Sequence, residues 1–489
     1  MSPARPGLGT AAAANLLGGG LGALVSLGIA ALVGRHLGPE GTGTFFLVVA
    51  AFLIASNTFE LGADTGLVRF VSAVRAVPAP AGVTHAQQVG RLVRTAVGPV
   101  LAVGLVVVAV GVPVGLAVAP AGLSPWVVVA AVPLAIVSSG TALALSVARG
   151  AGEALSFPLV HNVLLPSGRL LAIAVVVWLG WDLSAVVGAW LLPVPVALAV
   201  AVALAARYVA RPVERAAAPG FWRFSAARGV TATVEVVLAW IDVFLVGVLA
   251  SPAAAGIYAV VTRCVRAGEV VQQAARVAVG PAISAAWARG ERDVVRSVYG
   301  VVTSAMIFVA WPFYLLLAIF AEPVLGLFGP GFVEGATALR VLCLAMALVM
   351  AAGAVQSVLL MAGRSSWQLA NRLVALAVVV VLNLLFVPTF GLEGAAWAWL
   401  AGIVAEAALT VHQVQGRLGL RPPLRPILLA AATSLVVVGL PALAVRLTWG
   451  DGWSVLAAAG LLLAVAHLGL GALWRDRLGL VELTRLRSV

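Results

Sequence analysis

The chain has little charge and no lysine. Only 10% of its 489 residues are charged, and all 30 basic residues are arginine. Soluble domains carry about 25% charged residues, whereas 62% of this sequence is hydrophobic and its mean hydropathy is +1.11. This composition excludes a water-soluble fold.

Residues that carry enzyme and metal chemistry are also scarce. The two cysteines, Cys264 and Cys343, stand apart without a CxxC pair, and the five His are scattered without metal-ligand spacing. No GxxxxGK[ST] motif is present to cradle ATP phosphates. We therefore expect no enzyme activity and no cofactor. Any transport must draw its energy from gradients or from the substrate, and Na⁺ and H⁺ are the alternative coupling ions.

The sequence has instead many apolar runs of about 20 residues, the length that a helix needs to cross a hydrocarbon core of ~30 Å. They predict an all-α polytopic membrane protein with about 14 transmembrane helices. The predicted spans lie near residues 10–33, 43–66, 95–118, 126–148, 157–180, 184–206, 228–250, 256–284, 299–321, 336–362, 367–388, 394–415, 427–446 and 454–473.

The arginines are distributed unevenly between these spans. With the N-terminus inside, the inner segments hold 22 of the 30 Arg and six acidic residues, whereas the outer loops hold two Arg and six acids. Cytoplasmic loops of membrane proteins are rich in basic residues. We therefore expect a multi-pass protein of the inner (cytoplasmic) membrane with both termini in the cytoplasm. The net charge of +12 is then a topology signal, so the expected partner is the lipid bilayer and not nucleic acid.

A short bend with Gly and Pro occurs twice, as LVGRHLGPEGTGTFF (32–46) and LVGVLASPAAAGIY (245–258), at an offset of 213 positions. Weaker echoes at similar offsets extend the repeat over six spans, and an even number of spans makes the two copies parallel repeats. The predicted organisation is an N-terminal six-helix lobe (1–206), a cytoplasmic inter-lobe loop (207–227), a C-terminal six-helix lobe (228–420), and two additional transmembrane helices with a cytoplasmic tail (421–489).

Three stretches carry a resemblance to a known family: ALVGRHLGPEGTGTFFLVVAAFLIASNTFELGADTGLVRFVS (31–72), LFGPGFVEGATALRVL (327–342) and NLLFVPTFGLEGAAWAW (383–399). They resemble the polysaccharide transporter family (O-antigen and exopolysaccharide flippases) of the multidrug/oligosaccharidyl-lipid/polysaccharide exporter superfamily. The resemblance implies that a lipid-linked glycan is moved to the outer leaflet by alternating access. It also implies glycosyltransferases or a polymerase of the same pathway as partners. The segment GALVSLGIAALVGRHLG lacks the Arg-Asp pair of the lipid II flippase subgroup, so a flippase for another glycan is expected.

Span eight carries more ionisable residues than any other predicted span. At 100° per residue they fall within about a 140° arc, which predicts one polar stripe on an apolar helix. The stripe consists of Arg263, Arg266, Glu269, Gln273 and Arg276. Charges within a membrane usually face a cavity and have a function. The surplus of Arg favours a diphosphate headgroup, because guanidinium groups bind phosphate oxygens bidentately. The resemblance also places Arg from the eighth helix in the substrate cavity.

Two acids of span seven, Glu235 and Asp242, are predicted at depths similar to those of Arg263 and Arg266. We expect these acids to hold the two guanidinium groups in position while the site is empty. The alternative interpretation is that all of these residues form internal salt bridges that stabilise the lobe.

Span two of the first lobe carries Asn57, Glu60 and Asp64 at positions i, i+3 and i+7 of one helix face. These residues form either a cation or proton site, or ion pairs with Arg69 or Arg169, and the sequence leaves both interpretations open. The remaining candidates for substrate binding, all Arg in or beside predicted spans, are Arg69, Arg169 and Arg372.

Two functions fit these observations. The first is a flippase that translocates a polyprenyl-diphosphate-linked oligosaccharide for cell-surface polysaccharide biosynthesis. The second is a cation-coupled multidrug or toxin exporter of the same superfamily. Such an exporter binds cations and needs acids, so the Arg of span eight favour the flippase.

The predicted topology is testable by cysteine labelling in intact cells. A cysteine replacing Ala254, in the second outer bend, should react with a membrane-impermeant reagent. One replacing Ala217, in the predicted inter-lobe loop, should react only after the cells are opened. The reverse pattern would show that the orientation is inverted.

Overall fold

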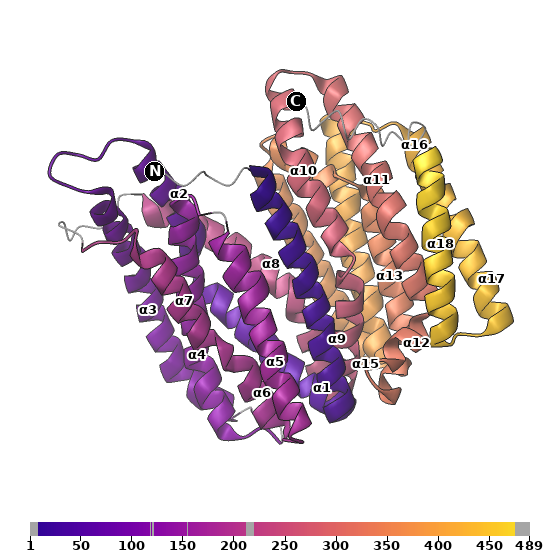
Figure 1. Cartoon of the computed structure of the whole chain (residues 1–489), viewed down its shortest axis with the longest axis horizontal. Coiled ribbons are helices and arrows are strands. Elements are labelled where there is room, and N and C mark those ends of the chain that lie inside the picture. The colour runs from indigo at the N-terminus through magenta and orange to yellow at the C-terminus, as the bar shows by residue number, and fades with distance from the viewer. Residues whose placement is uncertain (1–7, 118, 120–121, 154, 212–219, 475–489) are drawn as a thin grey trace. The chain divides into compact units, whose positions relative to one another are not determined.

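The computed structural model describes the backbone of residues 8–117, 119, 122–153, 155–211 and 220–474, and their side chains except those of residues 8–17, 277, 278 and 281. Within these ranges the regular elements are helices, and no strand occurs (Figure 1). The predicted all-α fold is confirmed. The chain divides into two compact units, residues 1–244 and 245–489, here called the first unit and the second unit.

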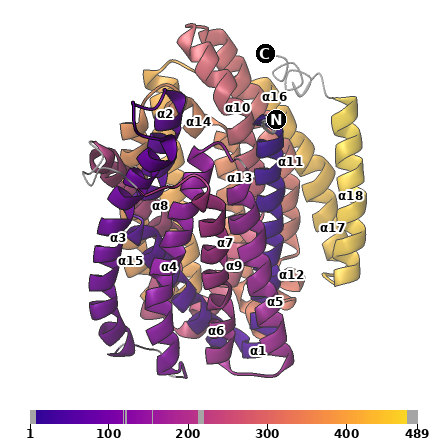
Figure 2. The ribbon, with the colours of Figure 1, turned by 60° about the vertical axis from the view of Figure 1, so that its left-hand side comes forward.

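The first unit packs its helices around α4, which contacts α1, α2, α3 and α7. Its core joins α2, α3 and α4 through Leu67, Leu92, Val100, Leu143 and Val147, and Phe221 at the start of α8 packs on it. Figure 2 shows α3 and α4 side by side, as does Figure 1. The elements are α1 (Leu8–Phe59), α2 (Ala63–Ala76), α3 (His85–Ala117), α4 (Pro125–Gly150), η1 (Pro158–Leu164), α5 (Leu165–Trp178), α6 (Leu183–Leu191), α7 (Pro193–Ala206) and α8 (Phe221–Leu249), within which the division between the units falls.

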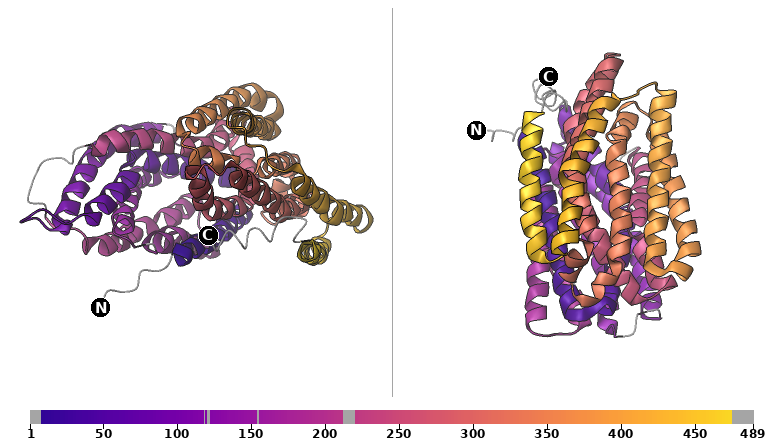
Figure 3. Two further views of the ribbon diagram at one scale, coloured as in Figure 1. Left: turned by 90° about the horizontal axis from the view of Figure 1, so that it is seen from above. Right: turned by 90° about the vertical axis from the view of Figure 1, so that its right-hand side faces the viewer.

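The second unit is built around α11, which packs against α10, α13 and α16. Helices α17 and α18, in yellow, lie side by side (Figure 3). His467 of α18 stacks on Phe308 of α11 with ring centroids 4.0 Å apart. The elements are α9 (Pro252–Arg266), α10 (Glu269–Ala288), α11 (Arg292–Ile319), α12 (Ala321–Gly326), η2 (Pro330–Gly335), α13 (Ala336–Ala352), α14 (Val355–Met361), α15 (Ser365–His412), η3 (Gln413–Arg417), α16 (Leu424–Ser434), η4 (Leu435–Gly439), α17 (Leu440–Trp449) and α18 (Trp453–Leu473).

Two helices are far too long for one crossing. Helix α1 has 52 residues and α15 has 48, whereas about 20 residues span a bilayer core. Each is interrupted by one glycine at positive φ: Gly38 (φ 67°, ψ −174°) and Gly391 (φ 56°, ψ −135°). Both glycines open the same pattern, Gly-x-Glu-Gly, in which only Gly adopts such a conformation without strain. Each long helix therefore supplies two crossings joined by a tight bend.

The number of crossings follows from this observation. Eleven helices of the described residues are long and apolar enough to span a membrane. Two of these are the double helices that contain Gly38 and Gly391, and α9 with α10 forms a further crossing that is divided into two shorter, more polar helices. Counted in this way, the described residues provide the fourteen crossings that the apolar runs predict.

Both copies of the repeated bend interrupt helical structure. In the first, Pro39 follows Gly38 directly. In the second, Ser251 caps α9: its side chain accepts a hydrogen bond from the Ala254 amide (3.1 Å), and Pro252 occupies the first turn. Pro lacks an N–H and is tolerated where a helix begins, so Pro39 and Pro252 play the same local role. The predicted lobe boundaries stay a prediction, although α8 begins at Phe221, inside the segment expected to be loop.

Proline also explains two π-helical turns. The turns η1 and η4 directly precede Pro166 and Pro441. A proline has no N–H to donate to the preceding turn, so the backbone there shifts to the wider i→i+5 pattern. Pro166 therefore accounts for the π-helical turn at the start of span five.

Glu322 of α12 connects three elements at the end of α11. Arg340 of α13 donates a hydrogen bond to one of its carboxylate oxygens, and Arg446 of α17 donates to the other, with Nη2 and Oε2 3.0 Å apart. Arg446 also donates to the carbonyl of Ile319. Burial raises the pKa of Glu322, but the hydrogen bond from Arg340 and both positive charges outweigh it and hold that pKa below its ordinary value of 4.5.

This triad predicts a pH-dependent stability. A carboxyl whose pKa is lower in the folded state stabilises the fold above its unfolded pKa and loses that contribution as the pH falls through the folded pKa. Glu322→Gln should therefore lower the free energy of unfolding at pH 7 by about 1 kcal/mol. It should also flatten the dependence of Tm on pH below about pH 4.5.

The measurement is thermal unfolding of the purified protein in detergent between pH 7 and pH 3. Glu334→Gln is the matched control, because Glu334 is an exposed acid of the neighbouring turn η2. Identical Tm profiles for the two variants would show that the triad does not stabilise the protein.

Candidate functional site

In the first unit, the second crossing is broken at the level of its acidic residues. Helix α1 ends at Phe59 and α2 begins at Ala63, and between them Leu61 (φ 50°) and Gly62 (φ 73°) adopt left-handed conformations. Positive φ is strained for a residue such as leucine, so the surrounding structure must impose this break.

Helix α8 supplies that constraint. A Cβ atom on Gly62 would lie 2.1 Å from the carbonyl oxygen of Ser225, and one on Gly229 would lie 2.5 Å from the carbonyl carbon of Leu61. Backbone therefore packs directly on backbone at this point, which only glycine permits. The break places Glu60 at the end of one helix and Asp64 in the first turn of the next.

The charge partner of these acids is Arg149 at the end of α4. The charges of Asp64 and Glu60 both act on its guanidinium group. That group also lies over the ring of Phe157, with Cζ 4.8 Å from the centroid. Phe157 in turn stacks on His161 of η1, with ring centroids 4.9 Å apart. We call Glu60, Asp64, Arg149 and His161, together with Arg169, the first-unit charge cluster.

Arg169 of α5 is held by Trp190 of α6. Its Nε donates to the Trp190 carbonyl oxygen (3.2 Å), and its Cζ lies 3.8 Å from the Trp190 ring centroid. The same indole makes edge-to-face contacts with Phe45 and Phe52 of α1. The cation is thus fixed on an aromatic face, which stabilises it in an apolar environment.

The first-unit charge cluster contains two acids and two arginines, so its formal charge is zero when His161 is neutral. In such a cluster the arginines neutralise the acids, which lowers the cost of placing these charges in the membrane. The acids bind a cation strongly only after an arginine moves away. Beside it, the side-chain oxygen of Asn57 is buried without a hydrogen-bond partner. Arg69 is not a partner of these acids in this structure: it is exposed and lies over the ring of Phe224, 4.3 Å from the centroid.

In the second unit, the predicted stripe on span eight does not lie on one continuous helix. Helix α9 ends at Arg266 and α10 begins at Glu269. A Cβ atom on Gly268 would lie 2.4 Å from the hydroxyl oxygen of Tyr314, and that hydroxyl donates to the carbonyl of Val265 (3.3 Å). Span eight therefore consists of two helices and not of the single helix that the apolar run predicts, whereas the common face of its charged residues stays a prediction.

The break changes the local role of the charges. Arg263 and Arg266 occupy the last turn of α9, and Glu269 occupies the first turn of α10. The positive arginines therefore lie at the partially negative C-terminal end of α9, and the negative Glu269 lies at the partially positive N-terminal end of α10. Both placements are favourable. Arg263 is half-buried and donates from Nη1 to the carbonyl of Ala259 (2.7 Å). Arg276 is exposed on α10.

The acids of span seven differ in exposure. Glu235 is exposed, and the closest pair of atoms between it and Arg228, two turns earlier on α8, is 3.9 Å apart. Asp242 is fully buried, and its Oδ1 accepts from the amide of Val243 (2.8 Å). The pairing of these acids with Arg263 and Arg266 stays a prediction.

A second polar network lies within the second unit. Glu406, only 3% exposed, pairs with Arg372 (Nε–Oε1 3.1 Å) and accepts a hydrogen bond from the side-chain amide of Gln356 (2.9 Å). Next to it, Asn371 and Gln413 exchange two amide hydrogen bonds of 2.9 Å each. These contacts join α14, both limbs of α15 and η3.

Comparison with known sequences identifies the chain. The family described as "Polysaccharide biosynthesis protein" matches residues 8–287, which is more than half of the sequence. The chain belongs to this family. The predicted family resemblance is thereby confirmed, and no curated protein matches the sequence individually.

Solved structures with the same fold are membrane transporters. The lipid II flippase MurJ, in an inward closed conformation, superposes with a TM-score of 0.75 at 11% identity, covering 93% of this chain and 97% of MurJ. An inward-facing multidrug resistance MATE family transporter gives 0.63 at 15% identity, with 81% and 94% covered. A MOP superfamily transporter from Pyrococcus furiosus gives 0.61 at 17% identity, with 85% and 97% covered.

These likenesses show the fold of this polysaccharide biosynthesis protein and not its substrate. MATE transporters of the same fold are known in inward-facing and outward-facing conformations, the two states of alternating access. Family and fold are those of multi-pass membrane transporters. Among the described residues, no group of three or more His, Cys, Asp or Glu side chains is placed to hold a metal ion.

Sequence reasoning missed two residues of this family member's polar clusters. Arg149 lies at the end of its span, immediately before Gly150, so its position in the sequence assigns it to an inner segment. Glu406 lies within span twelve, and an acid inside an apolar run is itself a signal. Its position four residues before Thr410 and seven before Gln413 places all three on one face of a helix. That pattern was readable from the sequence.

The role assigned to Arg149 is testable by charge removal. Arg149→Met removes the positive charge that acts on Glu60 and Asp64. All three residues are half-buried, so the free energy of unfolding should fall by about 1 kcal/mol. Combining Arg149→Met with Glu60→Gln should recover part of that loss, because one of the uncompensated charges is then removed.

Thermal unfolding in detergent measures both effects, and Arg69→Met is the matched control because Arg69 is exposed. If Arg149→Met unfolds at the same temperature as the control, Arg149 does not balance these acids.

Proposed function

We propose that this protein is a flippase that translocates a polyprenyl-diphosphate-linked oligosaccharide across the cytoplasmic membrane by alternating access. The observation that carries this proposal is the family match over residues 8–287, whose description is polysaccharide biosynthesis. A chain with a transporter fold contributes to that process by moving a precursor across the membrane. Its substrate is then a sugar on a lipid carrier, because free sugar polymers do not reach the hydrocarbon core.

Arg263 and Arg266 support a diphosphate as the recognised group. Both are half-buried at the C-terminal end of α9, directly before the bend at Gly268. Guanidinium groups present paired N–H donors that match the spacing of phosphate oxygens. A headgroup bound here replaces hydrogen bonds such as that from Arg263 to the Ala259 carbonyl. Arg276, Arg169, Arg69 and Arg372 are weaker candidates, because they are exposed or already held by Trp190, Phe224 or Glu406.

The bend in span eight supports a link between binding and conformation. Tyr314 packs against Gly268 and bonds to Val265, so α11 and the two halves of span eight are coupled. A ligand shifts a conformational equilibrium only through different affinities for the two states. A change of the bend alters the distance from Glu269 on α10 to the two arginines of α9, Arg263 and Arg266. A diphosphate bound at Arg263 then has different affinities for the two states.

The first-unit charge cluster and the Glu406–Arg372 ion pair of the second unit are proposed sites of Na⁺ or H⁺ coupling. Protonation of Glu406, or a cation at its carboxylate, releases Arg372 and Gln356 at the same time. In the first unit, the same change at Glu60 or Asp64 releases Arg149. Both clusters connect separate helices, so loss of a charge pair frees elements that otherwise stay together.

The second candidate function, a cation-coupled multidrug or toxin exporter, is favoured by the MATE-like fold. An organic cation needs acids that are not neutralised by nearby arginines. Glu60, Asp64 and Glu406 all have arginine partners within their own unit, so this candidate requires those pairs to separate. The flippase proposal includes a role in cell-surface glycan synthesis and a location in the inner membrane with both termini in the cytoplasm. It also includes enzymes of the same pathway as partners.

Replacement of Arg263 tests the proposal directly. Arg263→Ala should lower glycan export about 10- to 100-fold, as expected when a hydrogen bond to a charged group is lost. Arg263→Lys should restore export only in part, because lysine keeps the charge but lacks the planar fork. The measurement is surface glycan per molecule of membrane-inserted protein.

Arg289→Ala is the matched control, because Arg289 is exposed and pairs with Glu291 of the same loop (2.8 Å). If Arg263→Ala exports glycan as the control does, the diphosphate is not bound there. If glycan export is normal but efflux of organic cations is lost, the exporter replaces the flippase as the function.

A further inference from the structure

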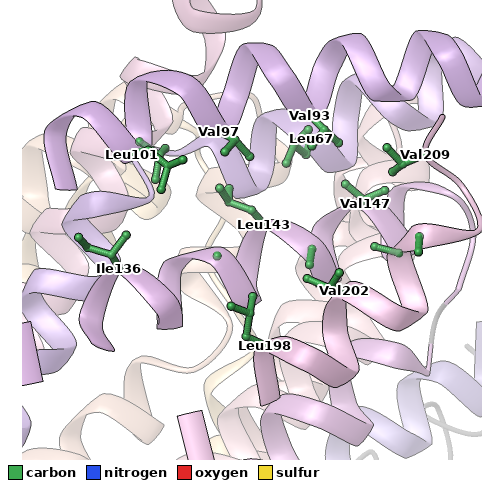
Figure 4. A pocket seen from close by; sticks show the side chains of 15 residues that line it. Leu67, Val93, Val97, Leu101, Ile136, Leu143, Val147, Leu198, Val202 and Val209 are labelled. Carbon is green, nitrogen blue, oxygen red and sulfur yellow. The ribbon is translucent and has the colours of Figure 1, made fainter. Parts of the chain in front are cut away.

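A large apolar cavity lies in the first unit, and no residue of the first-unit charge cluster lines it. It has a volume of about 450 Å³ and lies between α2, α3, α4 and α7 (Figure 4). Its fifteen lining residues are all apolar, among them Leu67, Val97, Leu143, Leu198 and Val202. Cavities without polar groups stay dry, so neither a sugar nor a phosphate is a suitable occupant of this space.

The volume favours one hydrocarbon chain. A methylene group is about as large as a water molecule, which occupies ~30 Å³, so the cavity accommodates about 15 such groups. That is the size of one acyl chain of a glycerophospholipid.

The cavity is accessible from the lipid side. Two lining residues, Leu101 of α3 and Val202 of α7, are 48% and 50% exposed. Figure 4 shows Leu101 and Ile136 at one end of the cavity and Val93, Val147 and Val209 at the other. Exposed aliphatic residues on membrane-spanning helices face acyl chains, so a chain enters the cavity directly from the bilayer.

The end marked by Val209 is basic. Arg94 lies on the same face of α3 as the lining residues Val97 and Leu101, at positions i, i+3 and i+7. Helical geometry places Arg94 about 10 Å from Leu101 along the axis, which is a suitable distance between a headgroup phosphate and the middle of an acyl chain. Arg94 is exposed.

Further arginines surround this end. Arg75 and Arg207 both lie over the ring of Tyr208, at 5.3 and 5.2 Å, next to the lining residue Val209. Arg211 follows and is exposed. Glu153 pairs with Arg207. The net positive charge at this end of the cavity therefore comes from Arg75, Arg94 and Arg211. Arginine near a membrane surface attracts anionic lipid headgroups.

We propose that this cavity is a binding site for an anionic glycerophospholipid, with one acyl chain between α3, α4 and α7 and the phosphate at Arg94. The site is separate from the proposed diphosphate site on α9 and does not depend on the transported substrate. It makes the packing of the first unit sensitive to the lipid composition of the membrane.

Photo-crosslinking tests this proposal with the full-length protein in vesicles. The probe is phosphatidylglycerol with a diazirine midway along one acyl chain, and the control lipid is phosphatidylcholine with the same chain. Crosslinks to phosphatidylglycerol should map to α3, α4 and α7. Ala144→Phe, which fills the cavity, should reduce them about tenfold, and Arg94→Gln should reduce phosphatidylglycerol labelling to the level of phosphatidylcholine.

Ala102→Phe is the matched control, because Ala102 is exposed on α3 and does not line the cavity. Val202→Phe at the exposed mouth provides a second variant that leaves the buried packing intact, and it should also reduce labelling. Labelling unchanged by both cavity variants would overturn the proposal. So would equal labelling by the two phospholipids, or displacement of phosphatidylglycerol by polyprenyl phosphate at equal concentration.

Discussion

The cost of leaving a backbone polar group without a hydrogen bond in hydrocarbon is the constraint on which this structure depends. It explains why the regular elements of the described residues are helices, which satisfy their own N–H and C=O groups. It also explains where helices break. At the break in span eight a neighbouring helix compensates, because the hydroxyl of Tyr314 binds the carbonyl of Val265. At Gly353, between α13 and α14, the hydroxyl of Tyr299 binds the carbonyl of Ala352 (3.1 Å). At these two breaks another helix therefore supplies a hydrogen-bond donor to a backbone carbonyl.

Charges obey the same constraint. Within the first unit, Arg149 balances the acids around the break in span two, and within the second unit Glu406 is enclosed by Arg372 and Gln356. These clusters lie beside interrupted or joined helices, so the charges that balance one another also connect separate elements of each unit. The arginines of α9 differ, since they belong to the end of a helix whose dipole favours cations. An anionic ligand adds to that arrangement without breaking an ion pair between helices.

Fold and family contribute different information about function. The fold is shared by a lipid II flippase and by multidrug transporters at 11% to 17% identity, so it establishes a transporter architecture without a substrate. The family match adds polysaccharide biosynthesis, and the arginines on α9 make a diphosphate carrier chemically reasonable. The apolar cavity of the first unit is independent of both the shared fold and the family match. Its aliphatic lining and its basic end are features of a site for a membrane lipid, and the charge cluster of the same unit does not line it.

The sequence by itself determined the helical class and the positions of the spans. Hydrophobic runs must cross the bilayer whatever their neighbours, so length and composition were sufficient, and Gly38 and Pro39 marked a bend through their own backbone restrictions. The acids of span two and the arginines of span eight were also visible, because charge in an apolar run is conspicuous. Tertiary structure alone decided which charges meet. Glu60 and Asp64 interact with Arg149, 85 residues beyond Asp64, and not with nearby Arg69, because packing of α4 against α2 brings that guanidinium group to them. Likewise, span eight is divided into α9 and α10 at Gly268, where Tyr314 of another helix lies close to the backbone. Local periodicity describes one helix at a time, whereas these pairings depend on contacts between helices that lie far apart in the sequence.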